Sequence, residues 1–201
     1  MPVLVDENEL EQFLMESWRD GYFPIDEKFG KLNNQVSIMG YGIIDILGTS
    51  FSMSLKDENK KISRRNINIK ITATIFELKK DVIDHRAVAQ ISRYKTGVEK
   101  ILKYFQYRNN IKRYDYEVNG ILIGSGYPEN SEICFLVDNC EWLRMFKYEI
   151  CMYSGLLLEE SNGWYKTNFD IDSFEIPQDI KSRFIGSYLK KETFWNKFFS
   201  E

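Results

Sequence analysis

The chain has 201 residues, of which 43% are hydrophobic and 15% aromatic, enough for one domain or one domain with a small appendage. Its formal net charge is −3 and its pI is near 5.5, which excludes nucleic acid binding through bulk positive charge and leaves only local basic patches. The 3 cysteines include no Cys-x-x-Cys pair, which excludes a four-thiolate iron–sulfur cluster and indicates free thiols. The sequence has no apolar run long enough for a membrane span and no signal-peptide pattern, so we expect a cytoplasmic protein.

Residues 6–19 are predicted to form a helix. Asp6 and Glu9 have the spacing of a capping box, and apolar side chains recur behind them at helical intervals. Glu7, Glu9 and Glu11 crowd the first turns, where the helix dipole favours acidic side chains. A structural role is therefore one interpretation of these three acids.

Three strands are expected next, at about residues 34–39, 42–48 and 67–79, with Gly40 between the first two. The polar insert from about Thr49 to Asn66 is longer than a hairpin turn needs. It contains the densest basic run of the chain, which we interpret either as a solvated hairpin tip or as a loop that contacts a phosphate backbone. This run comprises Lys56, Lys60, Lys61, Arg64 and Arg65.

Charged residues stand at the ends of two of these strands, where Asp45, Glu77 and Lys79 interrupt apolar runs. A buried charge is unfavourable unless a partner or a metal compensates it, so three such groups indicate a site. Glu77 and Lys79 are two residues apart and project to the same face of their strand. If the Asp45 strand pairs beside it, the two carboxylates meet, and Mg²⁺ or Mn²⁺ is the kind of cation that such hard oxygen ligands suit.

A long helix is expected from Val82 or Ile83 to about Tyr107. Three basic side chains recur on it at seven-residue intervals, either as a solvated face or as a nucleic-acid contact: Arg86, Arg93 and Lys100. Gln90 lies at the boundary of the apolar face, from which an amide could reach a water or a phosphate. Tyr94 falls nearer the apolar side, which favours core packing of its ring.

The order Asp45, then Glu77-Leu78-Lys79, then Gln90 and Tyr94 resembles the PD-(D/E)xK nuclease superfamily, and most closely its RecB-like and NucS-type endonuclease branches. The resemblance covers roughly residues 7–126. Two departures are Ile44, which stands where the family name implies proline, and the long polar insert. Neither departure removes a proposed ligand.

This resemblance implies a restriction-endonuclease-like α/β core with a central mixed sheet flanked by helices. It implies a Mg²⁺- or Mn²⁺-dependent endonuclease that acts on DNA, with RNA as an alternative substrate. Asp45, Glu77 and the backbone carbonyl of Leu78 would hold the metal, with Glu11, ahead of Glu9, as an outer ligand. Lys79 would position the attacking water and Gln90 would help to orient it. The residues expected to bind nucleic acid are Arg64, Arg65, Lys80, Arg86, Arg93, Tyr94 and Lys100.

The C-terminal third lies largely beyond this resemblance. Two strands are expected at about residues 116–123 and 133–137, then a helix at about 142–153 and a small hairpin around Asn162-Gly163. We place a domain boundary between the core, residues 1–140, and an α+β extension, residues 141–201. Four aromatic side chains near the chain end, Phe194, Trp195, Phe198 and Phe199, are expected to pack on the core or in a homodimer.

A second hypothesis comes from a different functional class. The chain could be a non-catalytic module that keeps the nuclease fold and presents its basic residues to nucleic acid or to a protein. The presence of Asp45, Glu77 and Lys79 together favours the enzyme.

Overall fold

The computed structural model describes residues 6–55, 67–108, 114–127, 132–151 and 155–161. No helix within these residues has the length and apolarity needed to cross a membrane. The elements, in chain order, are α1 (Glu7–Arg19), β1 (Lys31–Ile38), β2 (Gly42–Leu55), β3 (Ile67–Leu78), α2 (His85–Arg108), β4 (Tyr114–Gly124), α3 (Glu132–Asp138), β5 (Leu143–Cys151) and β6 (Gly155–Glu160).

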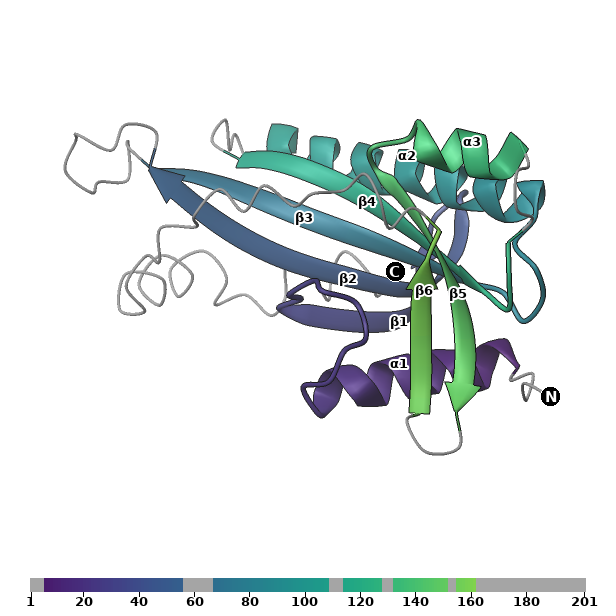
Figure 1. The fold of residues 1–201 in the computed structure, drawn as a ribbon. Helices are drawn as coiled ribbons and strands as arrows, with labels where there is room; N and C mark the ends of the chain where they lie inside the picture. Colours follow the sequence, from purple (N-terminus) through teal and green to yellow (C-terminus); the bar gives the residue numbers. More distant parts are fainter. Residues whose placement is uncertain (1–5, 56–66, 109–113, 128–131, 152–154, 162–201) are drawn as a thin grey trace.

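All of the described strands join one mixed sheet in the order β1-β2-β3-β4-β5-β6. Strands β1, β2 and β3 are antiparallel, β4 and β5 run parallel to β3, and β6 returns antiparallel to β5. Helix α2 connects the parallel strands β3 and β4, and it lies with α3 on one face while α1 covers the other (Figure 1). The fold is therefore the expected α/β class, a central mixed sheet flanked by helices.

Helix α1 begins at the predicted capping box. The backbone N–H of Glu9 donates to Asp6 Oδ1 at 2.8 Å, and the backbone N–H of Asp6 donates to Glu9 Oε2 at 3.1 Å. These two bonds satisfy backbone donors that the first helical turn leaves without partners. The predicted helix at residues 6–19 is confirmed.

The sheet separates two apolar layers, and β3 shows how its residues divide between them. Ile75 packs in the layer with α2, whereas Phe76 and Leu78 pack in the layer with α1. All three side chains have no exposed surface. Because side chains alternate along a strand, Glu77 lies on the α2 face, as the next residue after Ile75 on that side.

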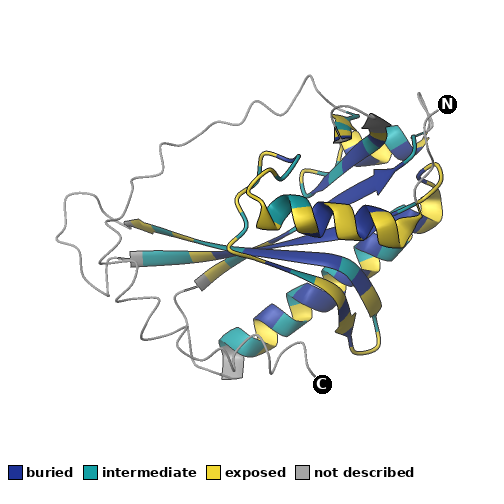
Figure 2. Cartoon of the chain, turned by 90° about the horizontal axis from the view of Figure 1, so that it is seen from below, coloured by how far each residue is buried: buried dark blue, intermediate teal, exposed yellow. Residues whose placement is uncertain are grey.

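Strand β2 is longer than expected, whereas β3 keeps nearly its expected bounds, and the far ends of the two strands extend beyond the helices as a short two-stranded arm (Figures 1 and 2). The expected end of the second strand at residue 48 is wrong, because β2 continues to Leu55, which pairs with Ile67. Figure 2 shows intermediate and exposed residues along the arm. Phe51 and Met53 are half-buried, with Phe51 against the layer of α2, and Ser52 and Ser54 are exposed, so this part of β2 lacks the continuous apolar run by which the strand was recognised. The basic run from Lys56 to Arg65 lies outside the described residues.

Two expected elements in the C-terminal third are wrong in type. The segment expected as a strand at 133–137 is part of α3, with Ile133 and Val137 buried one turn apart. The segment expected as a helix at 142–153 contains β5, which pairs in parallel with β4. Short apolar runs fit either period, and here pairing with the existing sheet decides the outcome.

Strands β5 and β6 extend the same sheet beyond residue 140. Ion pairs of Arg144 on β5 connect these strands to each other and to Glu27. Arg144 Nε and Nη2 donate to the two carboxylate oxygens of Glu160 at 2.7 Å each, and Nη1 donates to Glu27 at 3.0 Å. Burial raises the pKa of Glu27, although Arg144 opposes this shift. The domain boundary at residue 140 stays a prediction, and the C-terminal aromatic residues with their dimer contact lie outside the described residues.

Candidate functional site

The candidate site lies where β2 and β3 stop pairing. Their antiparallel ladder runs from Leu55 opposite Ile67 to Ile46 opposite Phe76 and ends there. The next positions in the same register are Asp45 and Glu77, so the two carboxylates come opposite one another at the first unpaired step. The expectation that the Asp45 strand pairs beside the Glu77 strand is confirmed.

Asp45 ends the ladder with its own side chain. The backbone N–H of Leu78, one residue past Glu77, donates to Asp45 Oδ2 at 2.8 Å. On its other side β3 continues to pair with β4, where Leu78 lies opposite Ile123. The Asp45 carboxylate therefore accepts from the Leu78 N–H in place of a backbone carbonyl of β2, which would have accepted it had the ladder continued.

The alternation of side chains along β2 is interrupted at Asp45. Ile44 and Leu47 both pack in the layer with α2, although they are three residues apart, whereas Ile46 packs in the layer with α1. A regular strand would place Ile44 and Ile46 on the same face. The residue opposite Asp45 on β1 is Gln35, which falls in a gap of the ladder between Asn34 and Val36. The local distortion therefore crosses both strands.

Glu77 is a buried carboxylate with one oxygen engaged and one without a hydrogen-bond partner. Its side chain is 1% exposed, and Oε1 accepts from Lys79 Nζ at 2.6 Å. Oε2 is buried and has no hydrogen-bond donor in the described structure. Burial and the charge of Asp45 raise the pKa of Glu77 to about 7, against the opposing effect of Lys79.

The pKa values of Asp45 and Lys79 are both raised, and the surrounding charges contribute to both shifts. Burial raises the pKa of Asp45, and the charges of Glu7 and Glu11 add to this, while the Leu78 N–H and Lys79 oppose it. Burial disfavours the charged form of Lys79, but its bond to Glu77 and the surrounding carboxylates outweigh that effect and raise its pKa. The ammonium of Lys79 is thus held in its charged form between acids.

Two acids of α1 approach this pair. Glu11 is 8% exposed, and it accepts a hydrogen bond from Asn34 Nδ2 at 2.8 Å and another from Gln35 Nε2. Glu7 accepts from the backbone N–H of Lys80 at 3.3 Å. Glu9 is engaged in the capping box. Glu7 was not expected at the site, although its spacing of one turn from Glu11 places both acids on one side of the helix and could have identified it.

The amide of Gln90 contacts Tyr94 rather than the charged groups. Gln90 Nε2 donates to the Tyr94 hydroxyl at 2.9 Å, and no described hydrogen bond joins it to Asp45, Glu77 or Lys79. Tyr94 is 3% exposed, so the expected core packing of its ring is confirmed. The ring fills the space over Gly42, where an added Cβ would come within 2.9 Å of it.

Four of the basic residues expected to bind nucleic acid are exposed: Lys80, Arg86, Arg93 and Lys100. No described carboxylate forms an ion pair with any of them. Arg93 instead lies over the Tyr94 ring at 5.6 Å, and Lys100 donates to the Tyr41 hydroxyl at 2.6 Å. Cations without acidic partners are available to a polyanion. Arg64 and Arg65 lie outside the described residues.

The donors present fit a hard dication such as Mg²⁺ or Mn²⁺. The lone buried oxygen of Glu77 is unfavourable without a positive partner, and a cation would supply one. Within the described part of the chain, no group of three acidic, histidine or cysteine side chains could hold a metal ion by itself. Mg²⁺ commonly uses one or two carboxylates and keeps several waters, so Asp45, Glu77 and a backbone carbonyl such as that of Leu78 suit it.

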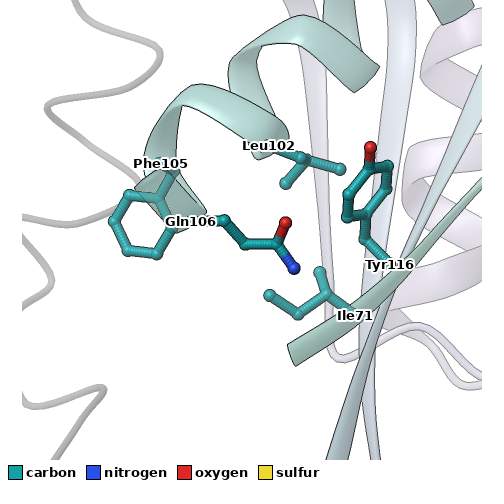
Figure 3. Close-up of a pocket in the computed structure, with 5 residues that line it drawn as sticks. All are labelled: Ile71, Leu102, Phe105, Gln106 and Tyr116. Atoms are coloured by element: carbon teal, nitrogen blue, oxygen red, sulfur yellow. The ribbon is translucent and has the colours of Figure 1, made fainter. Parts of the chain in front are cut away.

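A small pocket elsewhere on α2 is not part of this site. It lies between the end of α2 and strands β3 and β4, and it is lined by Ile71, Leu102, Phe105, Gln106 and Tyr116 (Figure 3). Glu77 is six positions along β3 from Ile71, which corresponds to about 20 Å. None of the charged residues of the candidate site lines this pocket.

No family model and no curated protein matches this chain. Among solved structures, the chain is similar to a repair endonuclease from Pyrococcus abyssi, with 22% sequence identity and a TM-score of 0.41. The alignment covers 72% of this chain and 47% of that one, so the chain spans about half the length of that structure. A similarity of this size carries no conclusion about function.

Proposed function

We propose that the chain is a divalent-metal-dependent nuclease that hydrolyses phosphodiester bonds in DNA, as an endonuclease. The observation that supports this most directly is the opposed pair Asp45 and Glu77 at the end of the β2–β3 ladder, with Lys79 bonded to Glu77. The oxygen of Glu77 that has no donor gives this pair a place for a cation.

Each residue has a role that follows from its contacts. Asp45 and Glu77, with the Leu78 carbonyl, would hold Mg²⁺ or Mn²⁺, which would offset the negative charge that develops on the phosphate oxygens. The Leu78 N–H keeps Asp45 in place by its 2.8 Å bond. Lys79, which is charged and only partly exposed, orients the attacking water and stabilises charge on the phosphate.

The exposed cations of α2 support a polyanionic substrate. Arg86, Arg93 and Lys100 are on the helix that follows the Glu77 strand, and none is paired with a described acid. DNA is the substrate we propose because the motif order resembles DNA nucleases, with RNA as the alternative. Gln90 would assist in water orientation only after its amide leaves the Tyr94 hydroxyl.

The test compares cleavage of supercoiled circles, linear duplex and single strands in the presence of Mg²⁺, Mn²⁺ or a chelator. Lys79→Ala is expected to reduce turnover by a factor on the order of 10² or more, as for loss of one preorganised donor, while metal binding is largely kept. Lys70→Ala is the matched control, because Lys70 is on the same strand and forms an exposed ion pair with Glu117.

An endonuclease opens circles, whereas an exonuclease requires ends. Metal-dependent cleavage that Lys79→Ala leaves unchanged would contradict the proposed site. Specific DNA binding without cleavage, together with no metal binding that depends on Asp45 and Glu77, would instead identify a non-catalytic binding module.

A further inference from the structure

We propose that Asn34 and Gln35 are positioning residues that hold Glu11 beside the metal-binding pair, and that the unusual backbone of Gln35 exists for this purpose. We call these two side chains the amide clamp. The inference rests on the proposed function, because the clamp would act on metal binding by Asp45 and Glu77.

Gln35 has a φ of +49°, in the left-handed region that side-chain-bearing residues rarely adopt. Among the described residues it is the single non-glycine with a positive φ. Strained backbone of this kind persists when its surroundings impose it, and it is concentrated at functional sites. Its position opposite Asp45 in the β1–β2 register places the strain next to the candidate site.

The left-handed residue allows two neighbouring side chains to reach one carboxylate. In a regular strand the side chains of Asn34 and Gln35 would point to opposite faces of the sheet. Here both amides donate to Glu11, with Asn34 on Oε1 and Gln35 on Oε2. The break in β1 therefore turns the second amide toward α1.

The result is a fixed carboxylate with each oxygen held by one donor. Glu11 is nearly buried, and its negative charge acts on Asp45. A carboxylate oxygen can accept more than one hydrogen bond, so each oxygen keeps capacity for a water in addition to the amide. Glu11 in this position contributes a third negative charge and a water-binding group beside the two proposed ligands.

A purely structural role makes a different prediction from a positioning role. If the clamp only satisfies a buried carboxylate, its removal should lower stability and leave metal affinity unchanged. If it positions Glu11 for the metal, its removal should lower metal affinity even in a variant that relieves the strain of the left-handed residue. Glycine accepts a left-handed backbone without the penalty, so Gln35→Gly separates the two effects.

The test uses the full chain and measures Mn²⁺ binding by calorimetry and thermal unfolding without metal. Gln35→Gly is expected to unfold at nearly the same temperature, because relief of the left-handed backbone offsets the hydrogen bond that Glu11 loses, and to bind Mn²⁺ about 10- to 100-fold more weakly, as for loss of a residue that orients a metal ligand. kcat should fall with little change in KM for DNA. Gln12→Ala is the control, because Gln12 is an exposed amide of α1 bonded to Glu16 and should change neither quantity.

Asn34→Ala provides a second variant if Gln35→Gly does not fold, since it removes one amide and leaves the backbone of Gln35 as it is. Mn²⁺ affinity unchanged in both variants, with the wild type binding normally, would overturn the clamp and leave the proposed function standing. A wild type without Mn²⁺ binding would overturn both.

Discussion

The pKa of Glu77 predicts a specific dependence of stability on pH in the metal-free protein. An ordinary glutamate has a pKa of 4.5, and that of Glu77 in the folded chain is about 7. A raised folded-state pKa means that the native state binds the proton more tightly than the unfolded state does. The favourable contribution of the protonated group is therefore complete below pH 4.5 and is lost as the pH rises to 7.

The size of this effect follows from the shift. One pKa unit corresponds to about 1.4 kcal/mol, so the shift of Glu77 corresponds to about 3 kcal/mol between pH 4.5 and pH values above 7. Glu77→Gln removes the titrating group and should remove that part of the dependence. At pH 8 the variant should gain stability relative to the wild type by up to this amount, less what the lost bond to Lys79 contributes.

The assay is urea unfolding of both proteins at several pH values from 4.5 to 8, in the presence of a chelator. Glu27 also has a raised pKa, but Glu77 is not among its causes, so its contribution cancels between the two proteins. Asp45 interacts with Glu77, so the difference between the two curves reports Glu77 together with this interaction. A difference that does not vary with pH would show that Glu77 titrates normally and would refute the reasoning. Added Mn²⁺ should stabilise the wild type at pH 8 and have much less effect on the variant.

Two further predictions concern residues around the site. Gly42→Ala should destabilise the chain by about 1–3 kcal/mol in urea unfolding, because Gly42 has a φ of +117° and its added Cβ would meet the Tyr94 ring; an unchanged midpoint would contradict the close packing. The double variant Arg93→Ala/Lys100→Ala should weaken binding of all DNA sequences alike and reduce the slope of log affinity against log salt concentration by about 2, measured by anisotropy. An unchanged slope would show that these two cations do not contact phosphates.

The charged pair could be predicted from the sequence because its signals are local. Asp45, Glu77 and Lys79 interrupt apolar runs, and the alternation of β3 assigns Glu77 and Lys79 to one face. The capping box at Asp6 and Glu9 is a local signal of the same kind. Such patterns depend on neighbouring residues only, and the structure confirms the helix, the strand pairing and the α/β fold.

The remaining features depend on contacts between distant residues. Nothing in the sequence around Gln35 indicates a left-handed residue, and its side chain donates to Glu11, which is on another element. β5 became a strand by pairing with β4, and α3 a helix that buries Ile133 and Val137 against the sheet, and short apolar runs encode neither outcome. Gln90 was expected at the site from its helical position, but the neighbouring Tyr94 hydroxyl takes its amide.

Titration of Mn²⁺ into the wild type, Asp45→Asn and Glu77→Gln, followed by calorimetry at pH 8, tests the central claim most directly. The account predicts saturable binding to the wild type that each substitution weakens strongly, since each removes one of the two carboxylates at the end of the β2–β3 ladder. Binding of equal strength in all three proteins, or none in the wild type, would contradict it.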